Sequence, residues 1–196
     1  MKLFNSIVLV LAFVAGASPV AARETGVNEA VLLAAAPALN GPFARTVVLA
    51  LPTGGGTHIG FILNRPSNLK VSAVFPEVPS AKEVASPVFV GGPQLSEMVV
   101  ALTLSPHAPT EEAVEVLPGL YMAFGHEEAA RAAARFPNRS RFYAGLVAWE
   151  SGELQAELDA GAWQVLEPDV DIVTGGSPDT LWQRVLERTR TMLARR

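Results

Sequence analysis

One short motif combines side chains that could bind an anion. Asn64-Arg65-Pro66 follows a predicted strand, so an amide and a guanidinium project from a stiff corner. A guanidinium in such a place can hold a carboxylate or a phosphate through paired hydrogen bonds. With that anion site as the alternative, we predict that Arg65 pairs with an internal carboxylate and pins the loop. Gly91 and Gly92, which end another predicted strand, complete the set of candidate ligand-binding residues.

Other patterns that could carry chemistry favour structural roles. The three glycines at 54–56 lie between two predicted strands, so they suit a hairpin turn rather than a phosphate loop before a helix. The three histidines lie far apart and match no metal-binding spacing. The sequence therefore predicts no metal site, no cofactor and no catalytic residue. A hydrolase or transferase that uses His126 with Glu127 or Glu128 near Arg65 is the least favoured alternative.

The charge of the chain argues against nucleic-acid binding. The formal net charge is −4 and the isoelectric point is about 5.4, whereas nucleic-acid binders usually carry a basic face. Eight arginines in the second half could form a basic patch, but interleaved glutamates favour separate solvated positions. These arginines are Arg135, Arg139, Arg141, Arg184, Arg188, Arg190, Arg195 and Arg196. The expected partner is therefore a protein or a small molecule.

The N-terminus has the three parts of an export signal. Lys2 supplies a positive charge, residues 7–17 are almost all apolar, and small residues precede a predicted cleavage after Ala22. The apolar run is too short to span a bilayer, so we expect residues 1–22 to be removed, leaving no stable membrane anchor. The mature domain, residues 23–196, would then be periplasmic or secreted. A cytoplasmic location is the alternative. The chain has no cysteine, which excludes disulfides and lipids attached through cysteine.

Strands dominate the first half of the chain, and helices arrive later. Runs of β-branched and aliphatic residues bounded by glycine or proline predict strands at 31–36, 45–51, 58–63, 87–90, 98–104, 113–116, 120–124, 141–149 and 163–166. Helices are expected at 69–75, at 127–135, at 152–160 behind Ser151, and from Pro178 behind Ser177. This order favours an α+β fold in which helices cover a strongly twisted mixed sheet.

Five sequence blocks occur in an order and spacing that are together specific. They are LLAAAP at 32–37 with PFARTVV at 42–48, GFILNRP at 60–66, VFVGGP at 88–93, the stretch from Phe142 to Trp163, and Trp182. Together these blocks resemble the AlgH/YqgE family of bacterial proteins over residues 32 to about 186. The resemblance implies a strongly bent, partly barrel-like mixed sheet flanked by helices. It implies no established activity and no catalytic residue.

The chain also departs from the family pattern. The family's Gly-Tyr-x-Gly-Trp-x-x-Gly-Gln-Leu appears at 145–154, with Leu146, Ala148 and Glu153 in place of the tyrosine, one glycine and the glutamine. Any ligand role of those positions in relatives is therefore in doubt here. We expect a non-enzymatic exported domain that binds a protein or small-molecule partner. The alternatives are an intracellular transcriptional regulator, as relatives are often labelled, and an uncharacterised hydrolase or transferase.

Overall fold

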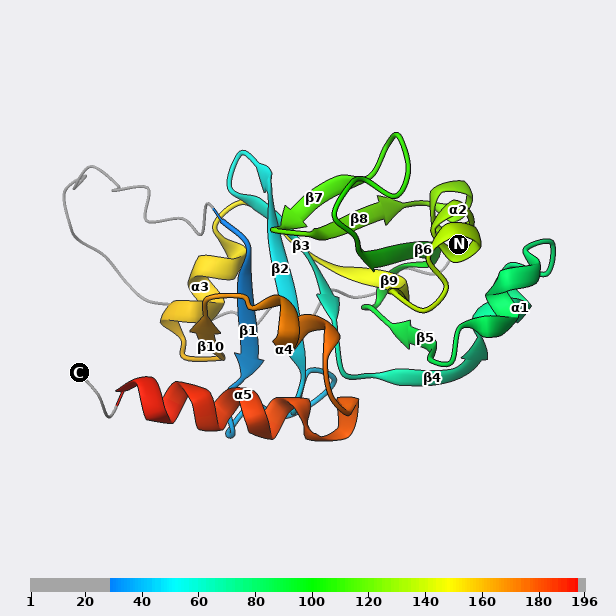
Figure 1. The fold of residues 1–196 in the computed structure, drawn as a ribbon. Coiled ribbons are helices and arrows are strands. Elements are labelled where there is room, and N and C mark those ends of the chain that lie inside the picture. The colour runs from blue at the N-terminus through cyan, green and yellow to red at the C-terminus, as the bar shows by residue number, and fades with distance from the viewer. Residues whose placement is uncertain (1–28, 194–196) are drawn as a thin grey trace, which may run out of the picture.

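The computed structural model describes residues 29–193, so the predicted signal and its cleavage point lie outside the described residues. Ten strands form one continuous curled sheet (Figure 1). The strands are β1 (Val31–Ala35), β2 (Val47–Gly54), β3 (Thr57–Ile62), β4 (Pro66–Lys70), β5 (Pro87–Val90), β6 (Gln94–Leu104), β7 (Val114–Leu117), β8 (Leu120–Phe124), β9 (Ser140–Trp149) and β10 (Trp163–Leu166). Their main order is β10-β1-β2-β3-β9-β6-β8-β7, and β5 joins at β9 and carries β4. The β5–β9 pair is parallel and the other pairs are antiparallel, which confirms a mixed sheet.

Short helices and one long C-terminal helix flank this sheet (Figure 1). They are α1 (Val71–Val74), the 3-10 turn η1 (Pro79–Glu83), α2 (His126–Arg135), α3 (Glu153–Asp159), α4 (Val170–Thr174) and α5 (Pro178–Leu193). The predicted α+β fold and its C-terminal helix are therefore confirmed. Within residues 29–193, the helices lack the combined length and hydropathy that crossing a membrane requires.

Both faces of the central strands are covered, which explains their nearly continuous apolar sequences. Successive side chains of a strand point to opposite faces of the sheet. In β1, Leu32 and Ala34 pack in the cluster that contains residues of α4 and α5, whereas Leu33 and Ala35 pack with Leu154 of α3. A strand with two buried faces reads as a hydrophobic run rather than as an alternating pattern.

The β2–β3 hairpin forms as the sequence predicts. Its two-residue turn consists of Gly55 and Gly56, whose φ angles are +60° and +79°. Tight hairpin turns of this kind need positive φ at both central residues, and glycine adopts it without a steric penalty. The turn chemistry and the two apolar runs are therefore consistent with each other.

The short helix expected at residues 69–75 is confirmed only in its central turn. The chain instead continues as β4 from Pro66 to Lys70, and α1 is a single turn from Val71 to Val74. Pro66 pairs with Phe89 of β5, and β4 has no other neighbouring strand. Proline is tolerated on such an edge because its missing N–H faces away from the partner strand. The strand at residues 66–70 therefore depends on pairing with β5, which is distant in the sequence, and not on the local secondary-structure preference of its residues.

Helix α4 has no counterpart among the predicted elements. Its cap is Asp169, whose side chain accepts a hydrogen bond from the backbone N–H of Asp171 at 2.9 Å. Arg188 of α5 also donates to Asp169 at 3.1 Å. These two hydrogen bonds, the backbone one first, lower the pKa of Asp169. A side chain far along the sequence therefore helps to hold this short helix in place.

Helix α3 begins differently from the prediction. Gly152, at a φ of +81°, stands at the N-cap, and the start of the helix has no side-chain cap. Glu153 instead accepts a hydrogen bond from the backbone N–H of Glu150 at 2.9 Å. The predicted capping role of Ser151 is therefore wrong, although the helix itself is confirmed.

Candidate functional site

Asn64 joins the end of β3 to the start of β2. Its Oδ1 accepts a hydrogen bond from the backbone N–H of Val47 at 2.9 Å, and its Nδ2 donates to the carbonyl oxygen of Arg45 at 2.9 Å. Both ends of the amide are therefore used within the fold. Asn64 holds the corner together and has little hydrogen-bonding capacity left for a ligand.

Arg65 makes a different contact from the predicted one. Its guanidinium donates to the carbonyl oxygen of Pro42, and the ion pairs among residues 29–193 do not include it. The prediction of an internal carboxylate partner is therefore wrong. Partial burial lowers the pKa of Arg65, but a guanidinium stays charged. Pro42 belongs to the loop between β1 and β2, so the hydrogen bond from Arg65 fastens this loop to the end of β3.

Gly91 and Gly92 allow two strands to pass close to β9. A Cβ atom on Gly91 would overlap the carbonyl oxygen of Gly145, and one on Gly92 would overlap the backbone of Leu146. The backbone N–H of Gly91 donates to Ala144 at 2.8 Å. Any larger residue would push the strands apart, so the glycines have a packing reason that requires no ligand.

The structure brings only part of the predicted set together in one cavity. Arg65 and Gly92 line a pocket of about 120 Å³ with five apolar residues, whereas Asn64 and Gly91 do not line it. The apolar residues are Pro42, Phe43, Ile62, Val90 and Pro93. A cavity this small and apolar has a single charged group, which is already bonded to a carbonyl. It is a weak candidate for a binding site.

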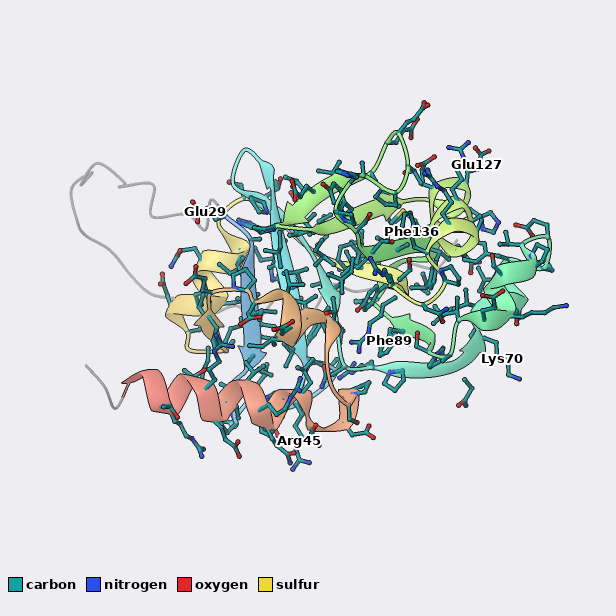
Figure 2. The ribbon with its side chains drawn as sticks, viewed as in Figure 1. Glu29, Arg45, Lys70, Phe89, Glu127 and Phe136 are labelled. Atoms are coloured by element: carbon teal, nitrogen blue, oxygen red, sulfur yellow. The ribbon has the colours of Figure 1, made fainter. Side chains whose placement is uncertain are left out.

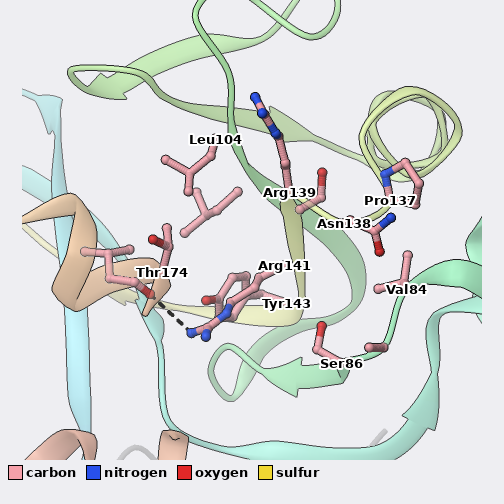
Figure 3. A pocket seen from close by; sticks show the side chains of 13 residues that line it. Val84, Ser86, Leu104, Pro137, Asn138, Arg139, Arg141, Tyr143 and Thr174 are labelled. Carbon is pink, nitrogen blue, oxygen red and sulfur yellow. Dashed lines mark hydrogen bonds between the residues drawn. The ribbon is translucent and has the colours of Figure 1, made fainter. Parts of the chain in front are cut away.

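A larger and more polar cavity, the β9 pocket, lies between the start of β9, the segment 84–86 and α4 (Figure 3). Its volume is about 260 Å³. Arg139, Arg141 and Tyr143 line it from alternate positions of one chain segment. Alternate residues of a strand share one face, so β9 presents Arg141 and Tyr143 toward the same space, whereas Arg139 immediately precedes the strand. Segment 84–86 and Thr174 supply opposite walls.

Tyr143 carries an unsatisfied polar group in the wall of this pocket. Its side chain is fully buried, and its hydroxyl group has no hydrogen-bond acceptor within the described chain, because the neighbouring Arg141 can only donate. Burial raises the pKa of Tyr143 to about 12, an effect that neighbouring Arg141 partly offsets. The phenol is therefore a proton donor throughout the neutral range. A buried donor without an acceptor costs about 1–3 kcal/mol, so it marks a place where an acceptor would be stabilising.

Arg141 lies beside Tyr143 without a carboxylate partner (Figure 3). It donates to the carbonyl oxygens of Val173 at 3.3 Å and Gly176 at 3.5 Å, and its guanidinium lies 5.7 Å from the ring centroid of Phe89. These hydrogen bonds are long and weak. Carbonyl groups at the end of α4 thus orient the guanidinium without neutralising it.

Arg139 is exposed at the rim, and its side chain points away from Arg141 (Figure 3). An exposed side chain can adopt other rotamers, including ones directed toward the pocket. The alternation of Arg139, Arg141 and Tyr143 is visible in the sequence. From the sequence, the two arginines are expected only as members of a possible basic patch, and Tyr143 is not among the predicted site residues.

The remaining predicted arginines do not share one partner. Arg135 donates to the carbonyl oxygen of Pro109 at 2.7 Å, Arg184 to that of Gly175 at 3.1 Å, and Arg188 to Asp169 at 3.1 Å. Arg195 and Arg196 lie outside the described residues. Local contacts of this kind explain several of the arginines without a common basic patch.

The residues of the least favoured enzyme hypothesis lie in different places. The ring of His126 packs 4.9 Å from that of Phe75, and its Nε2 lies 3.7 Å from Glu77. Glu128 pairs with Arg131 on the same helix. His126 and Arg65 line separate pockets, so the structure does not bring them together. In the part of the chain that the structure describes, no group of three or more His, Asp or Glu residues is arranged to hold a metal.

A model of a family described as AlgH-like matches residues 32–194. The chain belongs to the AlgH-like family. Similar AlgH-like relatives include a UPF0301 protein of Streptomyces avermitilis, which is 32% identical over 168 residues, or 83% of this chain and 87% of the relative. A UPF0301 protein of Chlorobium luteolum is 30% identical over 158 residues, or 79% and 82% of the two chains. The family consists of uncharacterised proteins, so membership supplies no activity.

Two solved structures share this AlgH-like fold. Protein DIP2367 of Corynebacterium diphtheriae has a TM-score of 0.69 at 24% identity, over 86% of this chain and 90% of the other. The AlgH protein of Pseudomonas aeruginosa has a TM-score of 0.67 at 24% identity, over 85% and 90% of the two chains. At this identity the likeness concerns the fold, and function has to be argued from the residues of the site.

Proposed function

We propose that this chain is a non-enzymatic binding protein that holds the anionic group of a small molecule in the β9 pocket. The observation that carries the proposal is the hydroxyl of Tyr143, a buried donor without an acceptor. Beside it lies Arg141, a guanidinium without a carboxylate among residues 29–193. An oxyanion in this pocket would supply the missing acceptor and the missing counter-charge at once.

The surroundings support an anion rather than a neutral ligand. The lining of the β9 pocket contains two arginines and no acidic residue, although the chain as a whole is acidic. Ser86, Asn138 and Thr174 add further polar side chains to the wall. Leu102 and Leu104 supply an apolar side, and such a surface strengthens electrostatic interactions by keeping water away. A phosphate or carboxylate group suits this combination of arginine and neutral donors.

Binding is tested directly with two simple anions. Inorganic phosphate and succinate are titrated into the mature protein, and chemical shifts of backbone amides are followed by NMR. We expect saturable shifts centred on Arg141, Tyr143 and Ser86. Tyr143→Phe, which removes the donor and keeps the ring, should weaken binding by roughly tenfold, since one hydrogen bond to a charged group contributes about 1.5–3 kcal/mol.

A matched control separates the pocket from general charge. Arg190→Ala removes one exposed positive charge that lies outside the lining of the β9 pocket, so it should leave the affinity within a factor of two of wild type, as is typical of screened distant charges. Arg141→Ala should weaken binding more than Tyr143→Phe does. Equal losses for Arg141→Ala and Arg190→Ala would show that the anions bind without using this site.

We also propose that the protein works outside the cytoplasm, on the strength of the three-part N-terminal signal. Intact-mass analysis of the protein from its native host should show a chain that begins at Arg23. A full-length species in the cytoplasm would overturn this part of the proposal, and it would leave binding in the β9 pocket unaffected.

The intracellular regulator remains the second candidate function, and its supporting feature is the arginine content of the C-terminal half. The acidic isoelectric point argues against it. Fluorescence anisotropy with labelled duplex DNA at physiological salt should detect no sequence-specific binding. A dissociation constant of about 10 nM or tighter for a specific DNA sequence, as genuine regulators show, would favour the regulator over the small-molecule binding protein.

A further inference from the structure

A second cavity adjoins the β9 pocket, and the two cavities share the segment 84–86 in their lining. This neighbouring cavity, the lysine pocket, has a volume of about 600 Å³. Val84, Ala85 and Ser86 line both cavities. Ligands held in the two pockets would therefore touch the same three residues.

The charges of the second cavity match those of the first. Lys70, at the end of β4 (Figure 2), and Lys82, in η1, both line the lysine pocket. They are the only lysines between residues 29 and 193, the range that the structure describes. No Asp or Glu lines either pocket. An acidic chain thus places its scarce lysines next to the two arginines of the β9 pocket.

These cations also lack counter-charges within the described chain. The ion pairs among residues 29–193 join His126 to Glu77, Arg131 to two neighbouring glutamates, and Arg188 to Asp169. None of them involves Lys70, Lys82, Arg139 or Arg141. Cations that line two cavities with a shared wall and have no counter-charge create a positive potential there, which favours an anion.

The two volumes indicate the size of the ligand. Pockets for organic molecules usually measure roughly 300–1,000 Å³, and the β9 pocket at about 260 Å³ lies below that range. It has room for one anionic group. The adjoining 600 Å³ provides room for the rest of an organic molecule and for a second charged end.

We propose that the ligand is a small organic molecule with two separated anionic groups, one held by Arg139, Arg141 and Tyr143 and the other by Lys70 and Lys82. This inference rests on the proposed anion site in the β9 pocket and extends it into the lysine pocket. The arginine end suits a planar carboxylate or a phosphate through the fork of the guanidinium. The lysine end is a pair of mobile point charges, which suits a phosphoryl or carboxylate group of less defined orientation.

The test compares probes that differ in one anionic group. Fructose 1,6-bisphosphate and fructose 6-phosphate form one pair, and adipate and hexanoate form the carboxylate pair. Affinities are measured by calorimetry at about 0.15 M salt, where distant charges are screened. We expect the probe with two anionic groups in at least one pair to bind about tenfold more tightly than its partner with one, and the pair that shows this identifies the group as phosphoryl or carboxylate.

Variants assign the two ends of the ligand. Lys70→Ala/Lys82→Ala should remove the preference for the probe with two anionic groups and leave the affinity for the probe with one group unchanged. Arg141→Ala should weaken both. Arg135→Ala/Arg190→Ala, which removes two positive charges from positions that line neither pocket, is the matched control and should keep the preference. Thermal melting of each variant shows that it is folded.

The outcomes separate the two claims. Equal affinity for the members of both pairs, or a preference that survives loss of both lysines, would overturn the two-group ligand and leave the β9 pocket as an anion site. Binding of all probes that is indifferent to Arg141→Ala would overturn the proposed function as well, as would no binding at millimolar concentrations.

Discussion

The motif-rich corner at Asn64, Arg65, Gly91 and Gly92 and the β9 pocket use their polar groups in opposite ways. In the corner, the amide and the guanidinium bond to backbone atoms, and the glycines permit close strand packing. In the β9 pocket, the Tyr143 hydroxyl has no acceptor within the described chain, and the hydrogen bonds from Arg141 to carbonyl oxygens are long. Satisfied groups stabilise the fold, whereas unsatisfied buried groups reduce stability unless a ligand completes them. The more recognisable sequence motif therefore marks architecture here, and the less recognisable alternation marks the candidate site.

Replacing Gly92 should have the largest effect on stability. In Gly92→Ala the new methyl group overlaps the backbone of Leu146, which cannot move without shifting β9. We expect a loss of about 3 kcal/mol or more in the free energy of unfolding, measured by urea denaturation. Gly54→Ala is the control, because its Cβ meets open space and only the positive φ is unfavourable, at about 1–2 kcal/mol. Equal losses in the two variants would show that close strand approach is not what the corner needs.

Truncating Asn64 should have the next largest effect. Asn64→Ala leaves the N–H of Val47 and the carbonyl oxygen of Arg45 without their partner, so we expect a loss of about 2 kcal/mol. Asn68→Ala, at an exposed position nearby, should change stability by less than about 0.5 kcal/mol. Phosphate affinity should be unchanged in folded Asn64→Ala. A loss of phosphate binding with wild-type stability would reverse the roles of the two regions.

The burial of Tyr143 should make the free energy of unfolding depend on pH in the alkaline range. Tyr143 has a folded pKa raised from 10.0 to about 12, so on raising the pH the unfolded chain loses this proton first. The contribution of Tyr143 to the free energy of unfolding is therefore constant below about pH 10, and stability falls as the pH rises toward 12. The loss relative to Tyr143→Phe should reach about 2 kcal/mol. Urea denaturation of both proteins between pH 8 and pH 12 measures it, and parallel curves would contradict a buried phenol.

Arg65 should have the smallest effect of the four. Arg65→Ala removes one hydrogen bond from a partly exposed guanidinium to the carbonyl oxygen of Pro42, so we expect a loss of about 1 kcal/mol. An internal ion pair would instead give roughly 3–5 kcal/mol, because its carboxylate would be left buried and unpaired. Denaturation midpoints distinguish the two values, and the larger one would restore the carboxylate partner.

Much of the fold could be predicted because several local signals agree. The glycines at 55 and 56 and the apolar runs on either side identify the β2–β3 hairpin without tertiary information. The segment at 66–70 could not be predicted in this way, because its strand exists only through pairing with β5. Helix α4 could not be predicted for a similar reason. It has only five residues, and its cap Asp169 is held by Arg188, which comes later in the chain.

By itself, the sequence determined the fold class, the hairpin, the long C-terminal helix and the family, because each depends on patterns that neighbouring residues share. It also placed Arg141 and Tyr143 two residues apart, a spacing that puts both on one face of a strand. Only the tertiary structure decided which motif is architectural and which distant residues line each cavity. It packs the corner glycines against β9 and brings segment 84–86 and α4 to Tyr143. Whether a polar group is satisfied depends on atoms from distant parts of the chain, and for this reason the site appears only after folding.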